Sequence, residues 1–244
     1  MALRRAGTLG PCVRSRWCVV GLTCLLASPS VAAAQAEKQF WVTGAIDWLA
    51  TERLTYEVEV EPKTNPATVD VTPEIEYTAV AWADLLAEVD FKSQTGTDSS
   101  ATPRIGVHLH ILSRLLRARA RRGADREKPP LRRVVVGTLL RLEYSNPTWR
   151  LRDRFELAYP VNRHRTTDNG AIYLRGDSEL FMPLDRASDE ALVSQVRLRA
   201  GLGYRPSFAW RFEALYIWNG TRHADSGPLV PDSHAIDIRI NRNF

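Results

Sequence analysis

Hydrophobic and polar residues alternate along most of the chain beyond residue 35. Between Arg53 and Glu61 the even positions are apolar and the odd positions are polar or charged. The same alternation runs through Trp149–Tyr159, Val196–Arg205 and Phe208–Trp218. A period of two places successive side chains on opposite faces of a strand, whereas an amphipathic helix repeats every three to four residues. The pattern therefore predicts a chain built almost entirely of β-strands.

Further segments fit the same period less regularly and bring the expected number of strands to eleven: Phe40–Leu49, Glu74–Trp82, Leu85–Gln94, Arg104–Leu112, Arg132–Tyr144, Ala171–Met182 and His234–Phe244. Residues 85–89 fit a short helix equally well. Polar residues predict longer loops at Thr64–Pro73, Ser113–Leu131 and Asn219–Ser233. No linker or internal repeat interrupts the series, so a single domain is expected.

Charged residues occupy the middle of the strands, on the face opposite the apolar one. A soluble sandwich would place them in water, and a transmembrane barrel would place them in its polar interior with the apolar face against lipid. A closed barrel also leaves no exposed edge strand. We therefore expect an all-β fold, a closed antiparallel transmembrane β-barrel of 10 to 12 strands, with twelve preferred because bacterial barrels have even strand numbers. The alternative is a soluble periplasmic β-sandwich binding protein. The expected lumen charge network comprises Arg141, Glu143, Arg150, Arg152, Arg154, Glu156, Arg175, Asp177, Glu179, Arg197, Arg199, Arg211, Glu213, Asp237 and Arg239.

Aromatic residues gather at or near the strand ends, as in the interfacial girdles of membrane barrels. They are Trp41, Trp48, Tyr56, Tyr144, Trp149, Tyr159, Tyr204, Trp210 and Trp218. The last segment places Ile236, Ile238 and Ile240 in alternation with polar residues and stops at Phe244. This resembles the terminal strand read by the outer-membrane barrel assembly machinery, so these four residues form the expected assembly signal. Arg242 departs from the pattern, because an aromatic residue is common at its position.

Residues 1–34 have the composition of a secretory signal peptide. Arginines precede an apolar stretch from Trp17 to Ala27, and small residues follow at the sites where cleavage is expected, after Ala34 or Ala36. The apolar stretch is shorter than the roughly 20 residues that a membrane helix needs. The sequence thus predicts an exported protein whose residues 35–244 form one outer-membrane β-barrel domain.

Removing this segment changes the charge balance. The chain has 33 basic and 28 acidic residues, but Arg4, Arg5, Arg14 and Arg16 lie in the first 34 residues and no acidic residue does. The remaining residues are close to neutral, so we expect no nucleic-acid partner. All three cysteines also lie before residue 35, which excludes disulfides, thiolate metal sites and cysteine nucleophiles from the rest of the chain.

His108 and His110 are weak catalytic candidates. They share a strand face with Arg104 and Gly106, so both imidazoles should point into the lumen. A barrel-embedded hydrolase would use such a histidine as a base oriented by a third group, but Ser178 falls on the outward face and no G-x-S-x-G motif occurs. The pair would need a further metal ligand, which the sequence does not assign. We therefore favour lumen-packing histidines and expect no metal and no cofactor.

Arginine supplies most of the basic residues. Because guanidinium groups bind carboxylates and phosphates, an arginine-lined lumen would suit an anion-selective pore. Acidic residues share most of the same strands, so we expect paired charges to fill the lumen as a structural network, with a narrow pore as the alternative. The basic run Arg114–Arg122, followed by Arg126 and Lys128, suits contact with lipopolysaccharide phosphates, although a solvated loop is favoured.

The second half of the chain resembles a known family. The segments that carry the resemblance are WRLRDRFELAYPVN, YLRGDSELFMPLD, VSQVRLRAGLGYRPSFAWRFEALYIW and HAIDIRINRNF. They are similar to small outer-membrane barrel proteins of Gram-negative bacteria grouped as a domain of unknown function. The resemblance implies a barrel in the outer membrane and implies no activity, so no functional residue is carried over from it.

These observations favour a porin-like, non-enzymatic protein of the bacterial outer membrane. The expected partners are outer-membrane lipid and lipopolysaccharide, together with the barrel assembly machinery during biogenesis.

Overall fold

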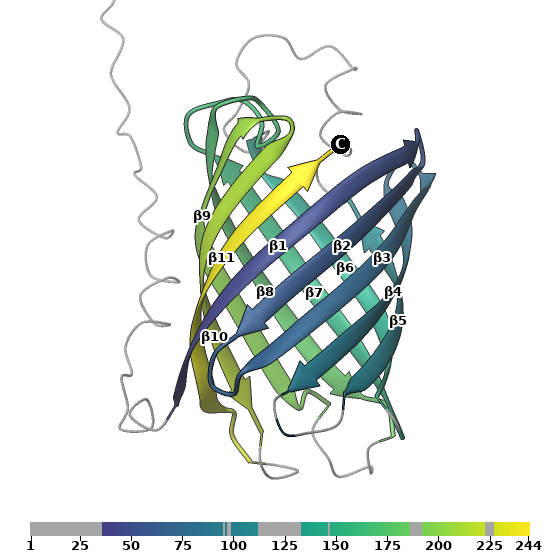
Figure 1. The fold of residues 1–244 in the computed structure, drawn as a ribbon, viewed down its shortest axis with the longest axis vertical. Coiled ribbons are helices and arrows are strands. Elements are labelled where there is room, and N and C mark those ends of the chain that lie inside the picture. Colours follow the sequence, from purple (N-terminus) through teal and green to yellow (C-terminus); the bar gives the residue numbers. More distant parts are fainter. Residues whose placement is uncertain are drawn as a thin grey trace, which may run out of the picture. The chain divides into compact units, whose positions relative to one another are not determined.

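A computed structural model describes residues 36–94, 96, 99–111, 133–145, 147–185, 192–222 and 227–244. Within these residues eleven strands form one closed barrel (Figure 1). The strands are β1 (Glu37–Thr51), β2 (Leu54–Lys63), β3 (Thr68–Val80), β4 (Ala83–Gln94), β5 (Ser100–Leu109), β6 (Val135–Ser145), β7 (Thr148–Pro160), β8 (Ala171–Pro183), β9 (Gln195–Ser207), β10 (Trp210–Thr221) and β11 (Val230–Asn243). In this part of the chain no helix is long and apolar enough to cross a membrane.

Each strand pairs antiparallel with the next, and β1 closes the barrel by pairing in parallel with β11. An odd number of alternating strands makes the first and the last run in the same direction, as Figure 1 shows for β1 and β11. The expected all-β closed barrel is confirmed, and the sandwich alternative is wrong because the sheet has no free edge. The preference for twelve strands is also wrong. The alternation predicts eleven strands, and an odd number can close because β1 and β11 pair in parallel.

Several boundaries differ from those expected. The segment Thr64–Pro73 is a loop only as far as residue 67, because β3 begins at Thr68 and continues the alternation through Val69 and Val71. Residues 85–89 are extended and lie in β4, where pairing with β3 and β5 fixes the strand conformation. The connection predicted at Asn219–Ser233 is shorter, since β10 reaches Thr221 and β11 starts at Val230. The loop predicted at 113–131 lies outside the described residues.

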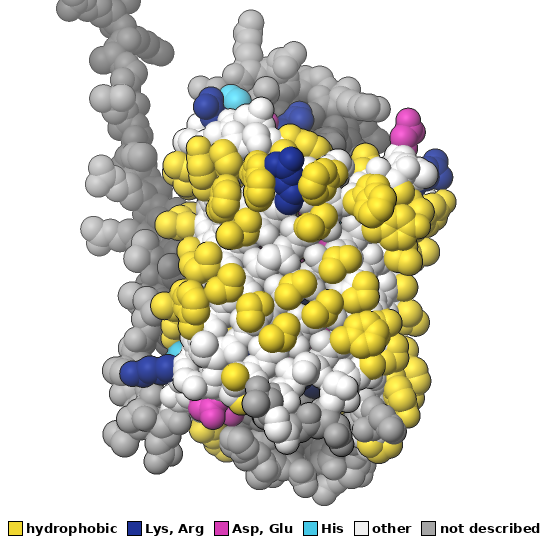
Figure 2. Space-filling model, in the orientation of Figure 1, with side chains coloured by type: hydrophobic (Ala, Val, Ile, Leu, Met, Phe, Trp, Pro, Cys, Tyr) yellow, Lys and Arg dark blue, Asp and Glu magenta, His cyan; other side chains and the backbone are white. Residues whose placement is uncertain are grey.

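The alternation sorts side chains between the outer surface and the lumen. On β1, Val42, Ile46 and Trp48 are exposed, whereas Trp41 and Thr43 are buried. Figure 2 shows apolar side chains spread over the outer surface, with charged side chains gathered near its two ends. The largest fully buried side chains include Leu215, Ile217, Glu143, Glu179, Thr43 and Asp237. The barrel is therefore polar inside and apolar outside, the inverse of a soluble domain.

Both rims of the barrel carry aromatic side chains. We call the end that contains Phe244 the C-terminal rim and the other end the opposite rim (Figure 1). At the C-terminal rim, the rings of Trp48 and Tyr56 meet edge to face at 6.2 Å. At the opposite rim, Tyr144 and Trp149 lie beside the turn between β6 and β7, with their centroids 4.9 Å apart.

Candidate functional site

The lumen contains a polar cavity of about 760 Å³. Its lining reaches from Asp47 and Glu76 near the C-terminal rim to Lys92 and Ser145 near the opposite rim. The cavity therefore extends along the barrel and is bordered mainly by charged side chains.

The structure places the fifteen charged residues of the expected lumen network inside the barrel. Three of them, Asp177, Glu179 and Asp237, are buried, each against an arginine of the barrel interior. The remaining members line the cavity: Arg141, Glu143, Arg150, Arg152, Arg154, Glu156, Arg175, Arg197, Arg199, Arg211, Glu213 and Arg239. The network borders the lumen and leaves the cavity between its members, so it does not fill the interior. A functional role for these residues stays a prediction.

The interior face of β7–β9, which we call the arginine wall, is centred on Glu179. One oxygen of this carboxylate accepts hydrogen bonds from Arg152 Nε and Nη2, at 3.1 and 2.7 Å. Its other oxygen lies 3.5 Å from Arg197 Nη1 and 3.7 Å from Arg199 Nη2. Arg199 also donates to Asp177 at 2.6 Å. The register explains the cluster, because Glu179 pairs directly with Arg197 on β9.

The interior face of β1–β4, which we call the acidic wall, has the opposite charge. Its lining carboxylates are Asp47, Glu57, Glu59, Glu61, Asp70, Glu74, Glu76, Glu88 and Asp90, with Lys63 and Lys92 as its cations. Several of these groups stand directly opposite one another, since Asp47 pairs with Glu57 across the β1–β2 ladder and Glu74 pairs with Glu88 across the β3–β4 ladder. Like charges at directly opposite positions are destabilising.

Sequence reasoning missed the acidic wall. The inward glutamates at alternate positions of Arg53–Glu61 are the local signal for it. Because charges of both signs border the cavity, the structure does not support an anion-selective lumen.

Arg104 on β5 links the two charge regions and was not among the expected network residues. Its Nη1 lies 3.0 Å from Glu88 and its Nη2 lies 2.5 Å from Asp90, both on β4. Its Nε donates to Glu143 on β6 at 3.0 Å. These bonds connect the acidic wall to the network that continues through Arg152 to Glu179.

Near the opposite rim, aromatic rings in the lumen meet arginine and lysine side chains. The guanidinium carbon of Arg197 lies 5.5 Å from the ring centres of both Trp41 on β1 and Phe181 on β8. The ammonium nitrogen of Lys63 also lies over the Trp41 ring, 4.6 Å from its centre. Since β1 and β8 are separated by β9, β10 and β11 in the barrel, Arg197 bridges across part of the lumen. We call Trp41, Phe181 and Arg197 the constriction.

Some buried donors of the lumen have no protein partner. Among the described residues these include the Nε atoms of Arg141, Arg154 and Arg211. A buried polar group without a partner is costly, so such donors are normally satisfied by water or by a ligand.

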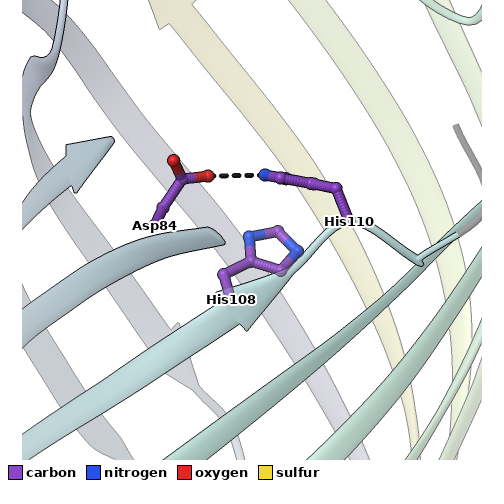
Figure 3. Close-up of side chains that lie close together, drawn as sticks. All are labelled: Asp84, His108 and His110. Atoms are coloured by element: carbon purple, nitrogen blue, oxygen red, sulfur yellow. Dashed lines mark hydrogen bonds and ion pairs between the residues drawn. The ribbon is translucent and has the colours of Figure 1, made fainter. Parts of the chain in front are cut away.

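His108 and His110 lie at the C-terminal rim beside Asp84, and we call these three residues the rim cluster. Asp84 on β4 pairs directly with His108 on β5, and the amide of His110 donates to the carbonyl of Trp82 at 3.0 Å. Asp84 Oδ2 lies 2.5 Å from His110 Nε2, the contact drawn in Figure 3. The two imidazole centroids are 4.4 Å apart.

The rim cluster lacks the nucleophile of a hydrolase. Among the residues that the structure describes, no serine or threonine hydroxyl bonds to His108 or His110, and Ser178 is on the outer face of β8 with its neighbours Asp177 and Glu179 turned inward. The hydrolase alternative therefore gains no support. The partner that sequence reasoning missed is Asp84, whose role depends on the β4–β5 register and leaves no local sequence signal.

The residues of the expected assembly signal lie on the last strand. Ile236 and Ile240 are exposed on the outer surface, and Phe244 is exposed at the rim. Arg242, which departs from the aromatic pattern, places its guanidinium carbon 4.6 Å from the ring centre of Trp210 and 4.8 Å from that of Phe244. Recognition of this strand by an assembly machinery stays a prediction. The basic run at 114–122 and the signal segment at 1–34 lie outside the described residues.

Comparison with known proteins gives one family. Residues 123–227 match a family described as "Protein of unknown function (DUF2490)". No curated protein matches the chain. The match covers three of the four segments that carry the resemblance and ends before HAIDIRINRNF. Similarity to a family of unknown function is therefore confirmed over residues 123–227, and it brings no activity with it.

Proposed function

We propose that the chain is an outer-membrane β-barrel protein whose lumen is a narrow, charge-lined passage for small hydrophilic solutes. The observation that carries the proposal is the inverted distribution of polarity: a closed barrel with an apolar outer surface around a cavity lined by charged residues. Lipid and lipopolysaccharide would contact the outer surface, and the assembly machinery would act during biogenesis.

The outer surface supports a membrane environment. Leu198 and Leu202 on β9, Phe212 and Tyr216 on β10, and Ile236 on β11 are all exposed on neighbouring strands. A soluble monomer rarely exposes so continuous an apolar surface. Strands of 10 to 15 residues are long enough, because a tilted membrane strand needs about 9–11. The aromatic side chains at both rims suit the two membrane interfaces.

Two features of the lumen favour a passage over a closed interior. The cavity has lining residues from both rims, and the unpartnered arginine donors need water or solute for hydrogen bonding. The constriction limits the size of what can pass. Charges of both signs line the route, so we expect a small conductance with weak ion selectivity.

Localisation is the first test. The full chain, expressed in a Gram-negative host, should appear in the detergent-insoluble outer-membrane fraction and migrate faster on gels before heating than after heating. Recovery in the soluble periplasm would overturn the membrane assignment.

Conductance is the second test. The refolded protein in planar bilayers should give small discrete current steps, and Arg197→Ala should increase the step size because it removes the bridge between Trp41 and Phe181. Arg163→Ala is the matched control, since Arg163 is exposed in the connection between β7 and β8. An absence of current in both the parent and the Arg197→Ala protein would replace the passage with a closed structural lumen.

A further inference from the structure

The rim cluster has a composition that no part of the proposed passage requires. It joins two imidazoles and one carboxylate at the C-terminal rim, and a carboxylate of β3 stands behind it. We propose that Asp84, His108 and His110 form a binding site for a divalent transition-metal ion such as Zn²⁺.

Strand geometry presents the three side chains to one point. His108 lies near the end of β5, and His110 directly follows the strand, where its amide still bonds the carbonyl of Trp82. The spacing of two residues in extended chain places both imidazoles on the same face. Asp84 pairs with His108 across the β4–β5 ladder, which puts its carboxylate on that face too. Figure 3 shows the Asp84 carboxylate and the His110 imidazole directed toward each other, with His108 beside them.

The separations suit a single ion. One ligand atom from each residue lies within 4.8 Å of the others. In tetrahedral zinc sites the bonds to imidazole nitrogen and carboxylate oxygen are about 2.0–2.2 Å, so the ligand atoms are roughly 3.3 Å apart. The contact between Asp84 and His110 is shorter than this, at 2.5 Å. Small side-chain rotations that open this contact and draw His108 inward would give the coordination distances.

The surroundings favour a cation. Glu76 on β3 lines the lumen two residues from Thr78, which pairs directly with Asp84 across the β3–β4 ladder. Glu76 is therefore placed to hold the Asp84 carboxylate in position or to supply a fourth ligand. The acidic wall continues from Glu76 to Asp47 near the same rim. Among the described residues, the side chain that bonds Asp84 is that of His110, and no arginine lies within ion-pair distance of it.

The site is accessible and has room. The His110 side chain is 34% exposed, which opens a route from solvent, while Asp84 is 7% exposed and held in the wall. Gly137 on β6 lies against His108, and a Cβ at this position would come within 3.1 Å of Nε2. The absence of a side chain there leaves the space that the imidazole occupies.

The donor set indicates the class of metal. Two neutral imidazoles and one or two carboxylates suit Zn²⁺, with Ni²⁺ and Cu²⁺ expected to compete according to the general order of divalent affinities. The set is poorly suited to Ca²⁺ or Mg²⁺, which prefer all-oxygen coordination.

The test measures Zn²⁺ binding to the full chain, refolded in detergent and stripped with a chelator. Titration against a chromophoric zinc chelator should give one site per chain, and Co²⁺ should produce the visible absorption band of a tetrahedral site. His110→Ala and Asp84→Asn should each weaken binding at least tenfold. Asp84→Asn retains the size of the side chain, and His110 lies at the end of its strand, so both variants are expected to keep the barrel.

The matched control is His234→Ala. His234 lies on β11, where its imidazole contacts Tyr216 and, within the described part of the chain, no other histidine, so its removal should leave the affinity unchanged. Heat-modifiable gel mobility should verify that every variant is folded. Absence of saturable binding by the parent chain at micromolar Zn²⁺, or equal affinity in the parent, His110→Ala and Asp84→Asn proteins, would overturn the proposal. The readout is independent of conductance, so this result and that of the passage test can be separated.

Discussion

The acidic wall and the arginine wall face each other across one lumen, but their charges are organised differently. On the arginine wall, carboxylates such as Asp177 and Glu179 stand between arginines, and each contacts more than one guanidinium. On the acidic wall, Glu57 and Glu74 instead stand directly opposite other carboxylates, Asp47 and Glu88. The same kind of side chain should therefore stabilise one wall and destabilise the other.

The largest effect is expected on the arginine wall. Glu179→Ala removes the buried carboxylate that Arg152, Arg197 and Arg199 share, and among the described residues Arg197 has no other carboxylate within 4.0 Å. Deleting one member of a buried pair typically costs about 3–5 kcal/mol. We predict a loss of this order in the free energy of unfolding, measured by urea titration of the detergent-refolded barrel. A second change, Arg152→Ala, should restore part of the loss because it removes one of the guanidinium groups that lose the Glu179 carboxylate.

The matched control for this prediction is Glu59→Ala on the acidic wall. Glu59 is 29% exposed and its contact with Arg239 is at 4.0 Å, so its removal should change stability by about 0–1 kcal/mol. Similar losses at Glu59 and Glu179 would show that the two walls do not differ.

The second prediction sets the arginine wall against the outer surface of the same strand. On β9, Arg197 and Arg199 point inward while Leu198 and Leu202 are exposed outside. If the outer surface faces lipid, Leu198→Arg or Leu202→Arg should destabilise the barrel. The free energy of unfolding should fall by about 2–4 kcal/mol for a position near the membrane midplane.

Gln195→Arg is the control for the lipid-facing variants, because Gln195 lines the cavity. Refolding into lipid vesicles, followed by chemical unfolding, measures all three. Equal tolerance of arginine at the three positions would mean that the outer surface of β9 does not contact lipid.

The contrast between the walls also shows which features of the lumen can be predicted from the sequence. The inward or outward direction of each side chain was predictable for residues such as Arg152 and Leu198, because a period of two is a local property of the strand. The charge partners were not predictable, since the contacts of Glu179 depend on which residues of β7 and β9 stand beside it.

The closure of the barrel and the rim cluster show the same difference between local patterns, which the sequence reveals, and long-range contacts, which it does not. Alternation along the chain indicated eleven strands, but the parallel pairing of β1 with β11 joins the two ends of the domain and has no local signature. The histidines at 108 and 110 were visible as an inward pair. Asp84 is more than twenty residues away in the sequence, and only the β4–β5 register brings it to them.

The smallest predicted effect lies within the acidic wall and has the opposite sign from the first. Asp47 and Glu57 stand directly opposite each other on β1 and β2, and like charges at such positions are destabilising, on a scale of roughly 0.2–1 kcal/mol. Glu57→Gln removes one charge and keeps a group that can donate a hydrogen bond to Asp47. We therefore predict a small gain in the free energy of unfolding by urea titration.

Glu61→Gln provides the control, because Glu61 lies on the same face of β2 but has cationic and hydroxyl partners. Its carboxylate is 2.7 Å from Lys63 Nζ, and it accepts a hydrogen bond from Thr43 at 3.0 Å. Neutralising it should lower stability, since Lys63 would lose a partner. Opposite signs for Glu57→Gln and Glu61→Gln would localise the repulsion to the part of the acidic wall near the C-terminal rim. A loss of stability in both variants would mean that the carboxyl pair at Asp47 and Glu57 is a favourable contact, and that the two walls are stabilised in the same way.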